Sequence, residues 1–163
     1  MSLTQLSNVL WREREMLEVL LFKLEEEQLL LAAGRSRWIA RATHEVEVVL
    51  EAIGKAELLR ATEVEAVARE MGMRPDTSLR ELAERAPSPW DDILRQHREK
   101  FLEVTGEISS LAEHNRELVT AGPRAAAAAL RTLDGAPEAE TFYGRGGAAE
   151  KVQVRSRLLD GAI

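Results

Sequence analysis

The chain has 163 residues, a formal net charge of −6 and no cysteine. Disulfide frameworks, thiolate metal centres and cysteine nucleophiles are therefore excluded, and nothing requires an oxidising compartment. The acidic balance leaves no basic stripe for nucleic acid, and charged residues interrupt the most apolar region before it reaches the length of a membrane span. Because the opening residues also lack the pattern of an export signal, we expect a cytoplasmic protein without nucleic-acid or membrane partners.

Residues 3–33 predict a long helix, because they contain no glycine or proline and place leucines at alternating steps of three and four. Glu13 and Glu27 fall on two positions of this seam, so charge interrupts it and bundle packing is favoured over a strict zipper. Residues 19–22 and 29–31 are runs of apolar side chains that point to more than one side of the helix. Two explanations stay open: the helix lies centrally among the others, or a second chain completes its surface.

Gly34 is expected to end this helix, and a second helix is predicted from a candidate cap at Ser36 to a stop at Gly72. So short a connection between two long helices predicts that they run antiparallel. Residues 78–81 then have the form of a capping box, which opens a short helix that stops at Pro87. Whether this short helix packs within the bundle or caps one end stays open.

Residues 88–91, Ser-Pro-Trp-Asp, predict the start of a third long helix, with a serine cap and proline at the first helical position. Apolar residues keep three-four spacing from there to Leu118. His97 and Asn115 occupy seam positions where an apolar residue is expected. Either they control register or recognise a partner helix, or they lie at the edge of the seam and reach water or a backbone carbonyl. Gly122-Pro123 is expected to break or kink the helix.

The alanine-rich residues 124–133 predict a helix that has little side chain to anchor it to a core. Together with Leu111, Leu118, Leu130 and Leu133, this segment could line a groove that accepts an amphipathic helix of another protein. Ordinary packing within the chain is the alternative.

From residue 134 onward, glycine, alanine, proline and glutamate predict a flexible C-terminal tail. Phe142 and Tyr143 stand in this tail, where they either anchor a partner or fold back onto the bundle. The predicted fold class is all-α: an elongated antiparallel bundle of three long helices plus short helices, occupying residues 1–133 and followed by the tail of residues 134–163.

Enzyme signatures are missing from the sequence. Gly54-Lys55 lacks the upstream glycine of a phosphate loop, and no histidine has the neighbours of a di-iron or zinc-protease helix. The runs of acids and bases are expected to be solvated helix faces. We therefore predict no catalysis, no metal and no cofactor, and a carboxylate metalloenzyme is kept only as a hypothesis that bound metal would support.

The leucine-rich opening helix, the string Asn115-Arg116-Glu117-Leu118 and the tail string Tyr143-Gly144-Arg145-Gly146-Gly147 together resemble the FlgN-like flagellar export chaperones, over nearly the full length. The resemblance implies a small cytoplasmic chaperone without ATPase activity. Such a protein binds the C-terminal helical regions of hook-associated, or hook–filament junction, proteins. It prevents their premature assembly and brings them to the export apparatus, with its gate and ATPase complex.

The same resemblance implies where these contacts lie. Docking to the export gate is expected at Phe142 and Tyr143, and client binding on the C-terminal helical part. The alternative is a structural coiled-coil protein that forms homodimers or larger assemblies without a client. The expected client-binding residues are Leu111, Asn115, Leu118, Val119, Ala126, Leu130 and Leu133.

Overall fold

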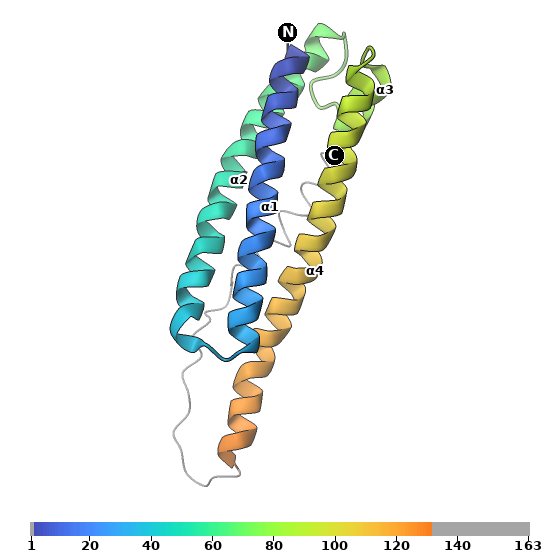
Figure 1. The fold of residues 1–163 in the computed structure, drawn as a ribbon. Helices are drawn as coiled ribbons and strands as arrows, with labels where there is room; N and C mark the ends of the chain where they lie inside the picture. Colours follow the sequence, from blue (N-terminus) through green and yellow to red (C-terminus); the bar gives the residue numbers. More distant parts are fainter. Residues whose placement is uncertain (1, 132–163) are drawn as a thin grey trace.

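The computed structural model describes residues 2–131, with side chains as far as residue 122. This part of the chain consists of helices: α1 (Ser2–Ala32), α2 (Ser36–Glu70), the short α3 (Leu79–Arg85) and α4 (Trp90–Arg131). α1 lies between α2 and α4, and α2 runs antiparallel to both (Figure 1). The predicted all-α bundle with three long helices is confirmed, and α1 takes the central place. The predicted tail lies outside the described residues.

The core is formed by the leucine seam of α1, which contacts apolar residues of α2 on one side and of α4 on the other. Because these side chains recur every three or four residues, they lie on one side of each helix and lose their contact with water when the helices pack. Phe101 of α4 is the largest fully buried side chain. The central members of the cluster are Leu6, Leu10, Leu17, Leu24, Val46, Ile53, Val67, Leu94, Phe101 and Ile108.

Glu13 and Glu27 do not interrupt the seam, contrary to the sequence prediction. Both carboxylates are buried in the bundle, so these two acids are not part of a solvated face. Each has polar side chains of other helices around it: Arg60 lies 3.5 Å from Glu13, and Thr43 and Asn115 donate hydrogen bonds to Glu27. At Glu27 these donors replace water, whereas within the described residues the Glu13 oxygens accept no hydrogen bond and have the nearby positive charge of Arg60 instead.

The connection between α1 and α2 is a tight turn in which Gly34 adopts φ of 64°. This left-handed conformation favours glycine, and it lets the chain reverse within three residues. The predicted cap at Ser36 is wrong, because Arg35 holds the cap position and makes no side-chain capping bond. The antiparallel pairing of α1 and α2 is confirmed by the 2.8 Å contact between Lys23 and Glu45.

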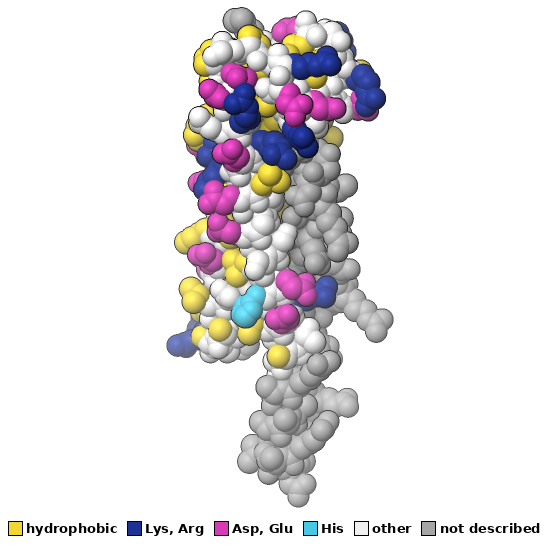
Figure 2. Space-filling view, turned by 90° about the vertical axis from the view of Figure 1, so that its right-hand side faces the viewer, with side chains coloured by type: hydrophobic (Ala, Val, Ile, Leu, Met, Phe, Trp, Pro, Cys, Tyr) yellow, Lys and Arg dark blue, Asp and Glu magenta, His cyan; other side chains and the backbone are white. Residues whose placement is uncertain are grey.

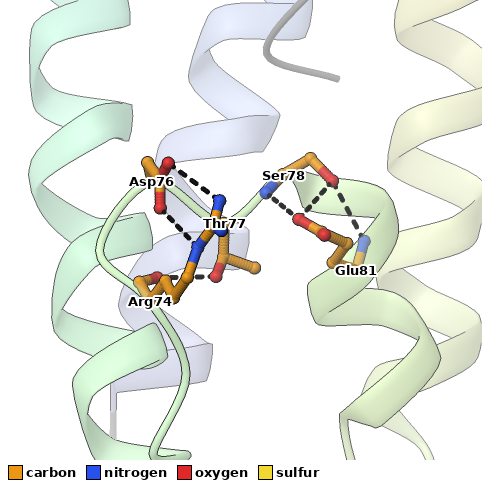
Figure 3. Close-up of polar contacts among 5 residues, drawn as sticks. All are labelled: Arg74, Asp76, Thr77, Ser78 and Glu81. Atoms are coloured by element: carbon orange, nitrogen blue, oxygen red, sulfur yellow. Dashed lines mark hydrogen bonds and ion pairs between the residues drawn. The ribbon is translucent and has the colours of Figure 1, made fainter.

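The connection from α2 to α3 is held by polar contacts (Figure 3). The Arg74 guanidinium donates two hydrogen bonds of 3.0 Å to the Asp76 carboxylate, and the Thr77 hydroxyl donates one to the Arg74 carbonyl. The predicted capping box is confirmed: the backbone N–H of Glu81 donates to the Ser78 hydroxyl, and the backbone N–H of Ser78 donates to the Glu81 carboxylate. The bonds that the Ser78 backbone N–H and hydroxyl donate to the Glu81 carboxylate hold the pKa of Glu81 below its usual value.

α3 packs on the first part of α4 and joins the common core through Leu79, Leu82 and Ala83, all of which are buried. It therefore closes the end of the bundle where the N-terminus lies (Figure 1). α4 begins at Trp90, one residue later than predicted. Pro89 precedes the helix, and its carbonyl, not a serine cap, accepts the first helical hydrogen bond, from Ile93.

α4 does not end at Gly122-Pro123, so of the predicted break or kink the break is wrong and the kink stays a prediction. A proline inside a helix removes only one backbone donor, and the alanines that follow have the highest helix propensity of any residue. α4 runs parallel to α1, with Ser7 opposite His97 and Leu24 opposite Asn115, at separations of 90 and 91 residues. Ala32, where α1 ends, is thus level with Gly122, and the last turns of α4 extend beyond the other helices (Figure 1).

Candidate functional site

A groove of about 470 Å³ lies between the second half of α1 and α4. Its apolar surface comes from Leu21 and Leu29 of α1 and Leu111 of α4, and Glu25 and Glu107 supply carboxylates. Among the described residues, its lining comes from α1 and α4, which are neighbours along their common length. The lining residues are Leu21, Glu25, Gln28, Leu29, Glu107, Ser110, Leu111 and His114, which we call the open groove.

Apolar side chains stay exposed on α1 beside the open groove. Leu29 is 69% exposed, Phe22 59% and Val19 46%. Leu29 and Phe22 are seven residues apart, so they lie on the same side of the helix. The central position of α1 thus covers only part of its apolar surface, and an unpaired strip faces the solvent next to the groove.

Figure 2 shows a face of the bundle to which α4 contributes, where charged and hydrophobic side chains gather in different parts. Charged side chains crowd the end of the bundle that α3 closes. Towards the other end, separate hydrophobic patches gather around a histidine. The open groove belongs to this second region, because Leu111 and His114 lie in the part of α4 that is level with the second half of α1.

Beneath the open groove, a buried polar contact fixes α4 to α1. The Asn115 amide donates hydrogen bonds of 2.9 Å to the Leu24 carbonyl and of 3.1 Å to the Glu27 carboxylate. Thr43 of α2 donates a second bond to the Glu27 carboxylate, at 3.0 Å. Burial raises the pKa of Glu27, and the two side-chain donors oppose this shift. One carboxylate thereby links all three long helices.

A second polar cluster lies nearer the end of the bundle where α3 packs. His97 of α4 is buried, with its Nε2 atom 3.2 Å from the Ser7 hydroxyl and its Nδ1 atom 3.4 Å from the Arg14 guanidinium. Burial lowers the pKa of His97 to about 4, and the nearby positive charge of Arg14 adds to this effect. The ring also meets Trp11 edge-on, at 5.3 Å between centroids. His97 is therefore a neutral packing residue at neutral pH.

Glu13 and Arg60 form a third buried polar site, between α1 and α2. Burial raises the pKa of Glu13 to about 7, although the positive charge of Arg60 opposes that shift. The Arg60 guanidinium also lies over the Phe101 ring, 5.7 Å from its centroid. The pair thus connects α1 and α2 to the largest core side chain of α4.

The predicted client-binding residues fall into three groups. Leu111, Leu118 and Val119 are half-buried on α4, and Leu111 lines the open groove. Asn115 is only 1% exposed and is bonded to α1, so it lies inside the bundle and not at the edge of the seam. The remaining residues lie beyond the described side chains: Ala126 and Leu130 are in the helical backbone of α4, and Leu133 lies outside the described residues. Phe142 and Tyr143, which are expected to dock to the export gate, also lie outside the described residues.

The sequence prediction missed the half of the groove that α1 supplies. Leu21, Glu25 and Leu29 line the groove together with Leu111, but no client contact was expected on α1. A signal was present in the apolar runs at residues 19–22 and 29–31, which are too extensive for one neighbouring helix. Their connection with α4 depends on the parallel pairing of two helices about 90 residues apart.

Within the described residues, no group of three or more metal-binding side chains comes together. None of the helices described is both long and apolar enough to cross a membrane. What the described part offers is a groove between helices in which leucines lie among polar and charged side chains, a kind of surface that suits an amphipathic helix of another chain.

The fold and the groove define a helical-bundle protein with an unfilled apolar surface. The pattern of the FlgN protein family matches residues 1–151, and the chain belongs to this family. Membership makes it a protein of the flagellar export chaperone type, a class not known for enzymatic activity. No curated protein and no solved structure is significantly similar to the chain.

Proposed function

We propose that this protein binds the C-terminal helical regions of hook–filament junction proteins in the cytoplasm, keeps them unassembled and delivers them to the flagellar export apparatus without catalysis of its own. The observation that carries the proposal is the open groove, which leaves Leu29 exposed beside the half-buried Leu111. An amphipathic client helix that filled the groove would remove both leucines from water. About 25 cal/mol is gained for each Å² of apolar surface buried in this way.

The client surface continues from the groove along α4. Leu118 and Val119 are half-buried, and they stand just before the point where α4 extends beyond α1. A helix protruding from a bundle offers its sides to a partner without displacement of another element. In this proposal Leu111, Leu118, Val119, Ala126, Leu130 and Leu133 contact the client, while Asn115 holds α4 in place through its bond to the Leu24 carbonyl.

Weak contacts with the protruding part of α4 allow the client to be released. Its alanines bury little apolar area, so contacts made there are individually weak and the client can leave during export. We place residues 1–133 in the client-binding helical domain and residues 134–163 in a tail. In that tail, Phe142 and Tyr143 dock to the export gate.

Co-purification with the C-terminal helical region of a hook–filament junction protein tests the function. Leu29→Asp places a charge in the open groove and should weaken binding about tenfold or more. Leu58→Asp on α2 is a matched control, because Leu58 is 72% exposed and does not line the groove. Truncation after Leu118 should abolish binding while circular dichroism still shows a folded bundle. Client binding retained in both the Leu29 variant and the truncated chain would contradict the proposal.

The exposed apolar strip of α1 also fits a second function, the structural homo-oligomer without a client. Val19 and Phe22 could pack against the same residues of another copy. Light scattering separates the two functions, since a client-binding chaperone gives a mass that changes when client is added. An oligomer that persists on dilution and ignores the client would favour the structural role.

A further inference from the structure

The open groove carries negative charge that the described part of the chain leaves unbalanced. Glu25 and Glu107 line it from opposite helices, and both are exposed. Within residues 2–122, neither carboxylate forms an ion pair. The lining residues include no lysine or arginine, and His114 is 4.0 Å from the carboxylate of Glu117. The apolar surface is thus bordered by acids on both sides.

Some exposed acids of α2 are neutralised within their own helix. Glu51 and Glu65 of α2 pair with Lys55 and Arg69 one turn away, at 3.3 and 2.6 Å. Such acids present no net charge to a partner. The same neutralisation is missing at the open groove, where a docked helix would shield Glu25 and Glu107 from water. Shielded carboxylates weaken binding unless the partner supplies positive charges to meet them.

We propose that the helix occupying the open groove is amphipathic and basic, with lysine or arginine flanking its apolar face; this inference rests on the proposed function and specifies the chemistry of the client. The apolar face fills the space over Leu29 and Leu111, and the flanking bases meet Glu25 on one side and Glu107 on the other. Positive flanks select the client and speed its approach, and the apolar contacts provide most of the affinity.

The exposed apolar strip of α1 indicates how long this occupant can be. Trp11, Phe22 and Leu29 lie on one side of α1 and are each more than half exposed. Arg14 and Lys23 lie over the Trp11 and Phe22 rings, so the unbalanced acids are those of the groove and not of the whole strip. From Trp11 to Leu29 this strip is about 27 Å long, the length of about 18 helical residues. A helix of that size is long enough to cover the groove and the strip together.

The same charges argue against a second copy of this chain as the occupant. A two-fold contact through the groove would bring the carboxylates of one copy, Glu25 and Glu107, close to those of the other. Each chain carries a net charge of −6, so approach is also disfavoured at long range. The unbalanced acids therefore favour a basic partner over self-association.

Two synthetic peptides of about 18 residues test the inference. Both carry the same leucines at three-four spacing, and one has lysines and the other glutamates beside them. With the full-length chain in calorimetry, we expect the lysine peptide to bind about tenfold more tightly or better, and its advantage to shrink as NaCl rises from about 0.05 to 0.5 M. Equal affinity of the two peptides would overturn the inference.

The double substitution Glu25→Gln and Glu107→Gln should remove most of the preference for the lysine peptide. The control Glu51→Gln with Glu65→Gln removes two exposed acids from α2 and should leave the preference unchanged. A preference that survives in the groove variant overturns the inference, as does a stable dimer of the free chain through the groove.

The client itself, titrated in the same calorimeter, separates the two proposals. If the C-terminal helical region of a hook–filament junction protein binds but Glu25→Gln with Glu107→Gln does not weaken it, the proposed function stands and the charge inference fails. If the lysine peptide binds at the groove and that region does not, the chemistry of the groove stands and the proposed client fails.

Discussion

The two ends of this bundle are finished in different ways. At one end, α3 covers the helices and buries Leu79 and Leu82, and the capping box at Ser78 fixes where α3 begins. At the other end, α1 and α2 meet in a bare turn at Gly34. There the open groove lies between α1 and α4, and α4 continues past its neighbours.

The difference shows how one leucine pattern can serve both folding and binding. Where a further helix covers the apolar side chains, they add to the stability of the fold. Where none does, the same kind of side chain stays in water and remains available to a partner. We call the first region the closed end and the second, which contains the open groove, the open end. The predictions that follow test this division.

Truncation of leucines should have unequal effects on stability at the two ends. Leu82→Ala at the closed end removes a fully buried side chain and should lower the free energy of unfolding by about 2–5 kcal/mol. Leu29→Ala at the open end should change it by no more than about 0.5 kcal/mol, because this side chain is mostly exposed. Urea unfolding followed by circular dichroism measures both. Similar losses in the two variants would show that the open end is sealed in solution.

The buried amide of Asn115, under the open groove, should contribute to the free energy of unfolding although it is polar. Asn115→Ala removes two hydrogen bonds to α1 and leaves the Leu24 carbonyl and the Glu27 carboxylate without a donor from α4. We expect a loss of about 2 kcal/mol. Thr120→Ala is the control, since Thr120 is exposed and its hydroxyl bonds only within α4, to the Arg116 carbonyl. If both variants unfold at the same urea concentration as the parent, Asn115 does not hold α4.

Two buried groups should give the stability opposite dependences on pH. Because the pKa of Glu13 is raised from 4.5 to about 7, the folded state binds its proton more tightly, and the contribution of Glu13 to stability falls as pH rises through this window. The pKa of His97 is lowered from 6.5 to about 4, so its contribution is full above 6.5 and is lost as pH falls towards 4.

Single variants separate these two effects. In Glu13→Gln only the His97 effect should remain, so that the free energy of unfolding rises by about 1–2 kcal/mol between about pH 5 and 7. In His97→Gln only the Glu13 effect should remain, so that the free energy of unfolding falls by a similar amount over the same range. Urea titrations at several pH values measure both, with the parent chain expected to show a weaker dependence than either variant. Slopes of the same sign would contradict the assignment.

A smaller loss than those at Leu82 and Asn115 is expected at the cap of α3. Ser78→Ala removes the acceptor for the Glu81 backbone N–H and should lower stability by about 1 kcal/mol. Ser78→Asp keeps a side-chain acceptor and should retain most of it. Thermal unfolding compares the three chains, and an unchanged midpoint in the alanine variant would mean that the cap does not hold the closed end.

The helices themselves could be predicted from the sequence, because leucine spacing, Gly34 and the capping box act over a few residues. Burial of Glu13 and Glu27 could not be predicted in the same way, since it depends on Arg60, Thr43 and other partners far along the chain. The groove could not be predicted for the same reason, because it also depends on residues far apart in the chain. Leu111 was singled out, whereas its counterparts on α1 become visible only when the two parallel helices are set side by side.

The continuation of α4 through Pro123 also could not be predicted from a rule that considers only neighbouring residues. Proline in a helix interior usually predicts an end, and here the neighbouring alanines favour the helix on the far side. Whether a helix survives a proline depends on the sum of such preferences over several turns. That sum is not visible in the Gly-Pro pair alone.

Amide hydrogen exchange of the full-length chain, with and without the C-terminal helical region of a hook–filament junction protein, tests most directly whether the open end binds the client. We expect slower exchange on client binding in residues 21–29 of α1 and 107–131 of α4, and no change in α2 or α3. Slower exchange confined to α2 or α3 while client is bound would contradict a client site at the open end.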